Sequence, residues 1–521
     1  MGAGKVYLVG AGPGDPKLIT VRGLEAIRRA DCIVYDRLAA PQLVRMAKED
    51  AELIYVGKLP ERHAMKQEEI NRLLTDLALQ GKTVVRLKGG DPAVFGRVGE
   101  EAEALRLNGI PYEIIPGVTS ATAVPIFAGI PVTHRDLASS FMVLTGHENP
   151  DKLDKLIEWD KVAHAAGTLV FLMGVAKIGY IAGQLMRHGK APETPVALVR
   201  WGTRAEQAVL AGTLADIEAK VKAAGFTAPA VIVVGDVVRL REFLAWAEQK
   251  PLFGTRVLIT RSPSQAGELA GKIDALGGEP YEFPVIETRM PEAPETVEAI
   301  RQALEEAESY DWVVLTSANG VRFFFDWLVR TGTDIRRFHR ARFAAVGPKT
   351  AEELALRGVR ADVQAEKFVA ESLAEAIGCV ASPGQKALLA RGDLARDVLP
   401  RELEKLGLRA KEIDIYETVP AGVRDPFLLD MLREGQIHVV TFTSGSTVRN
   451  LLDALGRMGA EDPAALLAKS RIVCIGPIAA REAEKCGLQV AAVADPYTLD
   501  GLVEAICRLK ANEGTSHHKG E

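Results

Sequence analysis

The chain has 521 residues, of which 47% are hydrophobic and 26% charged, with a formal net charge of -5, a composition typical of a globular protein with several compact units. The mildly negative charge excludes the basic surface of a nucleic-acid-binding protein, and no apolar stretch is long enough to cross a bilayer. The five cysteines form no C-x-x-C pair and the nine histidines show no metal-ligand spacing, so we expect a cytoplasmic protein with no metal, no nucleic-acid partner and no membrane contact.

Short β-branched runs alternate with amphipathic segments through the first half of the chain. Strands are predicted at Val6–Gly10, Cys32–Tyr35, Thr83–Leu87, Phe141–Thr145 and Thr168–Leu172. Helices are predicted between them, for example at Gln67–Leu79 and Gly99–Leu107. This alternation predicts α/β layers with mostly parallel sheets.

A domain boundary is predicted near residues 243–254, where a helical pattern ends, a proline and a glycine follow, and a strand restarts at Arg256–Thr260. We therefore assign residues 1–248 to one module and residues 249–511 to a second. The remaining residues, 512–521, have no apolar content, which predicts a disordered tail.

The second module contains an internal duplication. RVLITRSPSQAGELAGKIDALGG, from Arg256, parallels KALLARGDLARDVLPRELEKLGL, from Lys386, and VVLTSANGVRFF, from Val313, parallels VVTFTSGSTVRNLL, from Val439. In the same way FPVIET parallels IDIYET, and FAAVGPKTAEELALRGV parallels IVCIGPIAAREAEKCGL. The offset stays at roughly 130 residues in each pair, which indicates a true repeat. We expect two similar α/β lobes with a cleft between them, a common place for a ligand.

Two glycine-rich turns follow predicted strands in the first module. VGAGPGD spans Val9–Asp15 and LKGGDP spans Leu87–Pro92, and each turn lets a ligand approach the backbone closely. A nicotinamide-binding oxidoreductase is one alternative for the first turn, although its prolines and its missing third glycine fit that fingerprint poorly. The second turn, taken alone, is also explained as a tight turn with a capping aspartate.

The two turns belong to a longer series of motifs within residues 5–245. In chain order the motifs are GAGPGDP, YDRL, VGK, QEEIN, KGGDPAVFGR, PGVTSA, GIPVTHR, TGH, FLMG and TPVALVRWGT. The series closely resembles the uroporphyrinogen-III C-methyltransferases of the tetrapyrrole methylase family. The resemblance implies an N-terminal two-lobed α/β fold, a homodimer formed through this module, and S-adenosylmethionine as the methyl donor.

The resemblance also implies a role for individual residues. The S-adenosylmethionine contacts would be Pro13, Gly89, Gly90, Asp91, Val94, Thr119, Ser120, Met173, Gly202 and Ala230. Asp36 of YDRL would be the general base and Lys58 of VGK a general acid. Arg97, Glu100 and Arg135 would contact the substrate, with Arg97 at the catalytic centre. Surface salt bridges are the alternative for the two arginines, and a strand-end turn is the alternative for Asp36.

Elementary chemistry agrees with these roles. A methyl sulfonium reacts by direct displacement, so the reaction needs no metal. The attacking pyrrole carbon must be oriented and must lose a proton, which a carboxylate accepts when burial raises its pKa. A substrate that carries many carboxylates suits forked guanidinium groups. The implied reaction is two methylations of uroporphyrinogen III, at C-2 and C-7, giving precorrin-2 for siroheme or cobalamin.

The duplicated region, roughly residues 254–508, resembles the uroporphyrinogen-III synthase family through TSANGV, VGPKTA, ARGDLARDVLP, YET and TFTSGSTV. The resemblance implies a C-terminal bilobal α/β fold with lobes at about 254–286 plus 419–508 and at about 289–415. It also implies a lyase that closes hydroxymethylbilane to uroporphyrinogen III with inversion of the D ring.

The implied synthase reaction depends on holding the substrate in shape, because the bilane readily loses its own hydroxyl. Hydroxyls and backbone amides at helix N-termini hold carboxylates well, or else simply cap helices. The expected substrate contacts are Ser317, Asn319, Thr443, Ser444, Gly445 and Ser446. Tyr416 is the candidate for assisting hydroxyl departure, with a packed linker tyrosine as the alternative. Arg391 and Arg396 would bind carboxylates or form salt bridges.

One alternative for the whole chain stays within tetrapyrrole chemistry. The first module would then be a later-step precorrin methyltransferase, and the second a non-catalytic bilobal module that binds tetrapyrroles. YDRL together with VGK and QEEIN speaks against this alternative.

Overall fold

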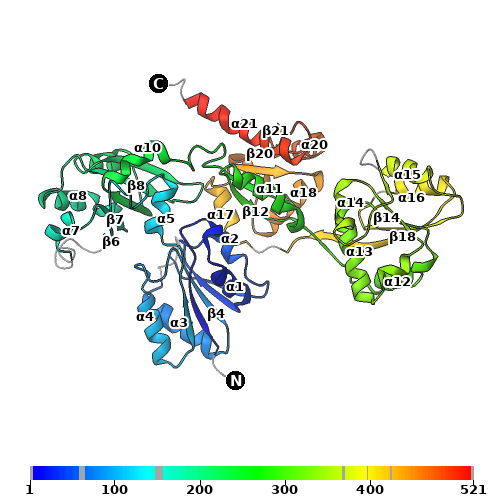
Figure 1. Cartoon of the computed structure of the whole chain (residues 1–521), viewed down its shortest axis with the longest axis horizontal. Helices are drawn as coiled ribbons and strands as arrows, with labels where there is room; N and C mark the ends of the chain where they lie inside the picture. The colour runs from blue at the N-terminus through cyan, green and yellow to red at the C-terminus, as the bar shows by residue number, and fades with distance from the viewer. Residues whose placement is uncertain are drawn as a thin grey trace. The chain divides into compact units, whose positions relative to one another are not determined.

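The computed structural model describes residues 4–57, 65–146, 157–365, 370–395, 397–422 and 425–517. The chain divides into two compact units, of which the first comprises Met1–Thr260, Gln265–Phe283 and Arg424–Glu521, and the second Arg261–Ser264 and Pro284–Val423. Each unit is built from β-sheets flanked by helices (Figure 1). Within the described ranges, none of the helices combines the length and apolar character needed to span a lipid bilayer.

The first sheet of unit 1 is fully parallel, with the strand order β3-β2-β4-β1-β5. Its strands are β1 (Val6–Gly10), β2 (Cys32–Tyr35), β3 (Glu52–Tyr55), β4 (Val84–Lys88) and β5 (Tyr112–Ile115), and its main helices are α1 (Val21–Arg29), α3 (Gln67–Leu79) and α4 (Val98–Leu107). On β1, Val6 and Leu8 pack into one core and Val9 into another. Burial on both faces explains the nearly continuous apolar runs that predicted these strands.

The second sheet of unit 1 has the order β6-β7-β10-β8-β9. Its strands are β6 (Phe141–Thr145), β7 (Thr168–Leu172), β8 (Pro195–Arg200), β9 (Ala208–Thr213) and β10 (Ala230–Val234), and its helices are α5 (Ser120–Phe127), α7 (Trp159–Ala165), α8 (Ile178–Arg187) and α9 (Ile217–Ala223). Only the pair β6–β7 is parallel. The expectation of mostly parallel sheets is therefore wrong here, because the short connection 201–207 joins β8 to β9 as a hairpin, which needs no crossover helix.

The third sheet of unit 1 is parallel, with the order β12-β11-β19-β20-β21. Its strands are β11 (Arg256–Ile259), β12 (Glu279–Glu282), β19 (Val439–Phe442), β20 (Arg471–Cys474) and β21 (Val490–Val493), and its helices are α11 (Pro263–Ala275), α17 (Leu428–Arg433), α18 (Gly445–Arg457), α20 (Pro477–Lys485) and α21 (Leu499–His517). Helix α21 runs into the tail that we predicted to be disordered. The buried residues Leu502 and Ile506 anchor this helix, and helix propagation beyond an anchored turn is favourable.

Unit 2 contains one sheet with the order β13-β18-β17-β14-β15-β16. Its strands are β13 (Ile286–Arg289), β14 (Trp312–Leu315), β15 (Arg342–Ala345), β16 (Val363–Gln364), β17 (Lys386–Gly392) and β18 (Arg409–Pro420), and its helices are α12 (Pro294–Glu305), α13 (Ala318–Thr331), α14 (Pro348–Ala355), α15 (Ala370–Gly378) and α16 (Val398–Lys405). Only the pair β13–β18 is antiparallel. The order β18-β17-β14-β15-β16 matches the order β12-β11-β19-β20-β21, so the sequence repeat corresponds to two sheets of one design.

Candidate functional site

Three sequence motifs lie at the carboxyl edge of the first sheet, namely GAGPGDP, YDRL and KGGDPAVFGR. Strands β2, β4 and β1 are parallel neighbours, so the segments that follow them lie at one edge, where ligands of α/β sheets bind. The turn that contains Pro13 is joined to the turn that contains Gly90 by a pair of backbone hydrogen bonds. The N–H of Gly90 donates to the carbonyl of Gly12 at 2.7 Å, and the N–H of Gly12 donates back at 3.2 Å.

The glycines of the second turn meet different steric demands. A Cβ on Gly89 would lie 2.4 Å from the Cβ of Leu38, so the glycine lets the YDRL segment pack against this turn. Gly90 has φ = 71°, and a Cβ there would meet nothing nearer than the backbone nitrogen of Ser120, at 3.7 Å. At Gly90 the positive φ, more than crowding, favours glycine, and the turn lies in ordinary van der Waals contact with the start of α5.

The polar residues of this edge hold the turns in place. The carboxylate of Asp91 accepts hydrogen bonds from the N–H of Ala93 at 2.8 Å and of Gly117 at 3.0 Å. Thr119 caps α5, because its hydroxyl accepts from the N–H of Ala121. Val94 packs half-buried against the core beneath α5. These contacts join the ends of β4 and β5 into one preformed surface.

The second sheet contributes three more predicted residues. Met173 directly follows β7 and has φ = 58°, while Ala230 begins β10, whose next residue pairs with the end of β7. Gly202 lies in the connection between β8 and β9, and a Cβ there would lie 2.5 Å from Val124 of α5. The N–H of Asp15 donates to the hydroxyl of Thr203 at 2.9 Å. The Gly202 connection is thus fastened to the turn that contains Pro13.

A chain of buried charges reaches the predicted base, Asp36. Arg86 donates to the Asp36 carboxylate at 3.1 Å and to the Glu101 carboxylate at 3.4 Å, and Lys88 donates to the same Glu101 oxygen at 2.7 Å. Glu101 is fully buried, and the Arg86 and Lys88 side chains are 6% and 7% exposed. Burial and the like charge of Arg86 lower the pKa of Lys88, although Glu101 opposes the shift. Asp36 itself is 27% exposed, so it can meet a ligand.

Sequence reasoning missed the inner members of this network, Arg86 and Glu101. One signal was present, since Arg86 and Lys88 alternate with Val85 and Leu87 in a strand that is otherwise apolar. Charged side chains inside a buried strand are rarely tolerated unless they are paired. Gln67 of the QEEIN motif also donates to Glu101, at 3.1 Å. This contact gives the first residue of the motif a structural role in the buried network.

The predicted substrate contacts of the first module lie at the surface. Arg97, which has φ = 58°, precedes α4 and forms a two-pronged ion pair with Glu100 at 2.8 and 2.7 Å. Arg135 is exposed in the loop that follows α5. Lys58, predicted as a general acid, lies outside the described residues.

The synthase candidates of unit 2 gather around Tyr416 on β18. The Tyr416 hydroxyl lies 3.3 Å from the Ser317 hydroxyl, which also caps α13 by accepting from the N–H of Gly320. The Tyr416 ring stacks on Phe323 with ring centroids 5.1 Å apart. Asn319 is buried and accepts a hydrogen bond from Arg322. The half-buried Tyr416 thus has a packed ring and a hydroxyl in a polar setting.

The remaining synthase candidates begin helix α18 in unit 1. The Ser444 hydroxyl accepts from the N–H of Thr447 at 3.3 Å and lies 2.9 Å from the Ser446 hydroxyl. Thr443 and Gly445 flank Ser444 and are half-buried. All four predicted residues are therefore part of one helix cap. In unit 2, Arg391 forms ion pairs with Glu412 and Asp397, and Arg396 lies outside the described residues.

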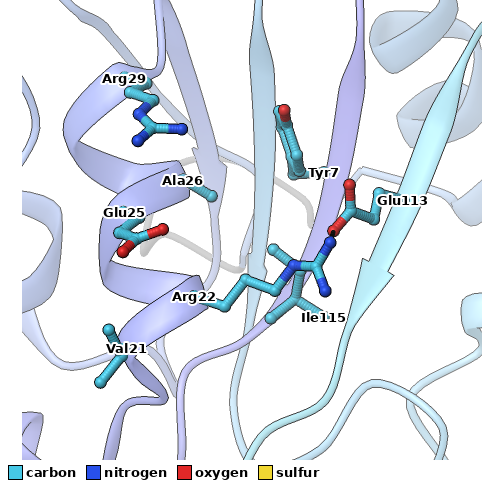
Figure 2. A pocket seen from close by; sticks show the side chains of 8 residues that line it. All are labelled: Tyr7, Val21, Arg22, Glu25, Ala26, Arg29, Glu113 and Ile115. Carbon is cyan, nitrogen blue, oxygen red and sulfur yellow. Dashed lines mark ion pairs between the residues drawn. The ribbon is translucent and has the colours of Figure 1, made fainter.

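A pocket of about 580 Å³ also lies between α1, β1 and β5 (Figure 2). Arg22 of α1 reaches across it to form an ion pair with Glu113 of β5, and Lys5 donates to the same carboxylate at 2.8 Å. None of the predicted site residues lines this pocket. The pocket is separate from the carboxyl edge that carries the sequence motifs.

Comparison with known families supports the division into two enzymes. Residues 5–218 match the family described as Tetrapyrrole (Corrin/Porphyrin) Methylases. Residues 267–504 match the family described as Uroporphyrinogen-III synthase HemD. The two matches follow each other along the chain without overlap.

Individual relatives cover different shares of the chain. The porphyrin biosynthesis protein HemD of Ruminiclostridium josui is 38% identical over 506 residues, which are 97% of this chain and 98% of that protein. The uroporphyrinogen-III C-methyltransferase of Bacillus subtilis is 45% identical over 68% of this chain and 72% of its own length. A solved structure from Thermus thermophilus, uroporphyrin-III C-methyl transferase complexed with S-adenyl homocysteine, is 39% identical and covers 46% of this chain and 100% of its own, with a TM-score of 0.39.

Proposed function

We propose that this chain, which belongs to the porphyrin-biosynthesis family that joins a tetrapyrrole methylase to a uroporphyrinogen-III synthase, carries out two consecutive reactions on one tetrapyrrole. The synthase closes hydroxymethylbilane to uroporphyrinogen III with inversion of the D ring. The methyltransferase then methylates uroporphyrinogen III twice, at C-2 and C-7, and the product is precorrin-2. S-adenosylmethionine supplies the methyl groups as an electrophilic sulfonium.

One observation carries the methyltransferase proposal. The turns that contain Pro13 and Gly90 and the carboxylate of Asp36 follow three adjacent parallel strands, at the edge where α/β sheets bind ligands. Gly90 has a positive φ and lies in van der Waals contact with Ser120 at the start of α5, so its turn has no side chain on the edge where a ligand would lie against the backbone. A different enzyme class, the nicotinamide oxidoreductases, lacks this support because both family matches are to tetrapyrrole enzymes.

In this proposal the residues around Pro13, Gly89–Asp91, Thr119–Ser120, Met173, Gly202 and Ala230 hold S-adenosylmethionine. Asp36 takes the proton that the methylated pyrrole carbon loses, and Arg86 fixes the direction in which its carboxylate points. Arg97 and Arg135 are exposed guanidinium groups that suit the carboxylates of the substrate. Arg97 would exchange its pairing with Glu100 for one with the substrate.

The synthase proposal assigns positioning to hydroxyl groups. Ser317 and Ser444 begin helices, where backbone N–H groups attract carboxylates. Tyr416 assists departure of the bilane hydroxyl through its own hydroxyl, which Ser317 and the stacked ring of Phe323 hold in place.

The proposal extends to the chain's assembly and its domain boundaries. We place the methyltransferase at residues 1–248 and the synthase at residues 249–511, with a homodimer formed through the methyltransferase in the cytoplasm. Light scattering on the purified chain tests the dimer. A monomer at micromolar concentration would contradict it.

The decisive experiment is to feed the pure chain with hydroxymethylbilane and S-adenosylmethionine and to identify every tetrapyrrole by mass spectrometry. We expect uroporphyrinogen III without the methyl donor, and a product heavier by two methyl groups with it. A type I isomer in the first case contradicts the synthase. A product without two added methyl groups contradicts the methyltransferase.

A further inference from the structure

The Gly202 connection of the methyltransferase is held in an unusual backbone conformation. Its two flanking residues, Trp201 and Thr203, have φ = 45° and 73°. These values lie in the left-handed region of backbone conformation, which residues other than glycine rarely adopt. Residues in such conformations persist only where the surrounding structure holds them, and they cluster at ligand sites. The contacts of this connection therefore show what holds it in place.

Part of the support comes from the methyltransferase itself. The N–H of Asp15 donates to the Thr203 hydroxyl at 2.9 Å. Arg204 donates to the carbonyl of Leu38 at 2.8 Å, and its guanidinium lies over the Trp201 ring at 4.9 Å. These contacts tie the connection to the turn that contains Pro13 and to the YDRL segment.

The rest of the support comes from the third sheet of unit 1. The strands of this sheet lie after the domain boundary that the sequence predicts near residues 243–254. The N–H of Ala205 donates to the carboxylate of Glu279, on β12, at 2.9 Å. The neighbouring Glu206 forms a two-pronged ion pair with Arg256, on β11, at 2.8 and 2.7 Å. Arg256 also donates twice to Glu279, at 2.9 and 2.8 Å. Two adjacent residues of the connection are thus anchored to the same pair of synthase strands.

Arg256 and Glu279, the two charged residues of this anchor on the synthase strands, are largely shielded from solvent, and each compensates the charge of the other. The Arg256 side chain is 3% exposed and the Glu279 side chain 17% exposed. Burial works to raise the pKa of Glu279, but the charge and hydrogen bonds of Arg256 outweigh it and hold that pKa below its ordinary value. Charge-assisted, two-pronged pairs of this kind impose a defined geometry as well as energy.

We propose that Glu279 of the synthase is a positioning residue for the methyltransferase, which holds the Gly202 connection in the shape that binds S-adenosylmethionine. The inference rests on the proposed function, because Gly202 is assigned there as a contact of the methyl donor. It adds that, in this chain, strands β11 and β12 help to hold the methyltransferase site in its binding shape. The fusion therefore links the two enzymes by structure as well as by sequence of reactions.

The test compares full-length variants by titration calorimetry with S-adenosylmethionine, together with steady-state kinetics of both reactions. Glu279→Gln removes the charge that anchors Ala205 and Arg256, and Glu206→Gln weakens the anchor from the methyltransferase side. Asp274→Asn is the matched control, because its ion pair with Lys17 crosses the same boundary but is exposed. We expect the dissociation constant and the KM for S-adenosylmethionine to rise about tenfold in the two anchor variants, as for a lost hydrogen bond to a charged group. Formation of uroporphyrinogen III should keep its rate.

Each outcome decides the inference. Folded anchor variants whose affinity stays within twofold of the unchanged chain would overturn it, and so would an Asp274→Asn variant that loses affinity equally. If Glu279→Gln fails to fold, as a lost synthase rate and a lowered melting temperature would show, Glu206→Gln decides alone, because it leaves Arg256 paired with Glu279. A wild-type chain that does not bind S-adenosylmethionine removes the proposed function, and the inference with it, whereas wild-type binding with unaffected variants removes the inference only.

Discussion

Backbone strain is distributed unequally between the two enzymes. Every described non-glycine residue with a clearly positive φ lies in the methyltransferase half, namely Phe95, Arg97, Met173, Trp201 and Thr203. In the described residues that follow the domain boundary, positive φ values occur only at glycines. The buried charges near Asp36 add to this contrast, because two of the synthase candidates, Ser317 and Ser444, are hydroxyl residues that cap helices.

This contrast agrees with the chemistry proposed for each half. Proton removal from carbon needs a positioned base, and the buried Arg86 positions the Asp36 carboxylate. Closing a bilane that loses its own hydroxyl needs shape more than reactive groups. Five experiments test this contrast.

The largest effect is expected for Asp36→Asn. Because the amide cannot accept the proton, kcat for methylation should fall by about 10²–10⁴-fold, while uroporphyrinogen III formation stays unchanged. Single-turnover methylation measured by mass spectrometry checks this. A variant with near-normal methylation removes Asp36 from the mechanism.

Glu101→Gln should destabilise the methyltransferase half. The change leaves the buried Lys88 without its anion and leaves Arg86 with Asp36 alone, and breaking a buried pair costs roughly 3–5 kcal/mol. Urea denaturation followed by tryptophan fluorescence measures the free energy of unfolding. The adjacent Glu100→Gln breaks only an exposed pair and should cost well under ~1 kcal/mol. Equal losses for the two variants would contradict the role given to the buried network.

Tyr416→Phe should slow uroporphyrinogen III formation by about tenfold, the value of one hydrogen bond, and leave methylation unchanged. The phenylalanine ring keeps the stacking on Phe323, so the loss reports on the hydroxyl. The control is Tyr310→Phe, since Tyr310 is buried in the same unit and its hydroxyl lacks a partner among the described residues. If Tyr416→Phe changes neither the rate nor the ratio of type III to type I isomer, Tyr416 is a packing residue.

Met173→Gly tests the strain directly. Relief of a left-handed conformation gains roughly 1–2 kcal/mol, which offsets the flexibility that glycine adds to the unfolded chain, so stability should stay level or rise slightly. In the synthase half, Arg301 lies within α12 and has no left-handed backbone to relax. Arg301→Gly should therefore lower the free energy of unfolding by about 1 kcal/mol. Urea midpoints compare the two. A larger loss for Met173→Gly than for Arg301→Gly would show that Met173 is not strained.

The smallest effect concerns pH. His438 accepts a hydrogen bond from the N–H of Arg256 at 2.8 Å, and burial, with the like charge of Arg256, lowers the pKa of its imidazole below 6.5. Below pH 6.5 the histidine of the unfolded chain binds a proton before the histidine of the folded chain does. The free energy of unfolding should therefore fall as the pH drops from about 6.5, and His438 should have no effect on it above that pH. His438→Gln should flatten this part of the melting-temperature profile. An identical profile in the variant would assign the slope to other groups.

The sequence predicted the first sheet well, because strands buried on both faces produce unmistakable apolar runs. Thr83–Leu87 was expected and Val84–Lys88 is found. The repeat predicted two sheets of one design, and the strand orders confirm it. Gly90 and Asp36, to which the resemblance gave roles, follow adjacent parallel strands and so lie at the same edge of the sheet, while their roles stay predictions.

Other features could not be predicted, because they depend on contacts between distant segments. Periodicity does not reveal that Glu101 of α4 folds back onto Arg86, nor that Glu279 reaches Ala205. The antiparallel strands of the second sheet escaped prediction because a hairpin and a crossover leave similar apolar runs. Helix α21 continues past the last buried residue by local propagation, which composition does not reveal.

The pairing of β11 with β19, in which Val257 lies beside Val439, has a consequence for synthesis of the protein. A ribosome releases β11 and β12 long before β19, and residues Pro284–Val423 of unit 2 emerge in the interval. Domains fold as units while translation proceeds, so the third sheet closes only when the chain is almost finished. If Glu279 anchors the methyltransferase as we propose, the enzyme made first reaches its full affinity for the methyl donor only after synthesis of the second enzyme is well advanced.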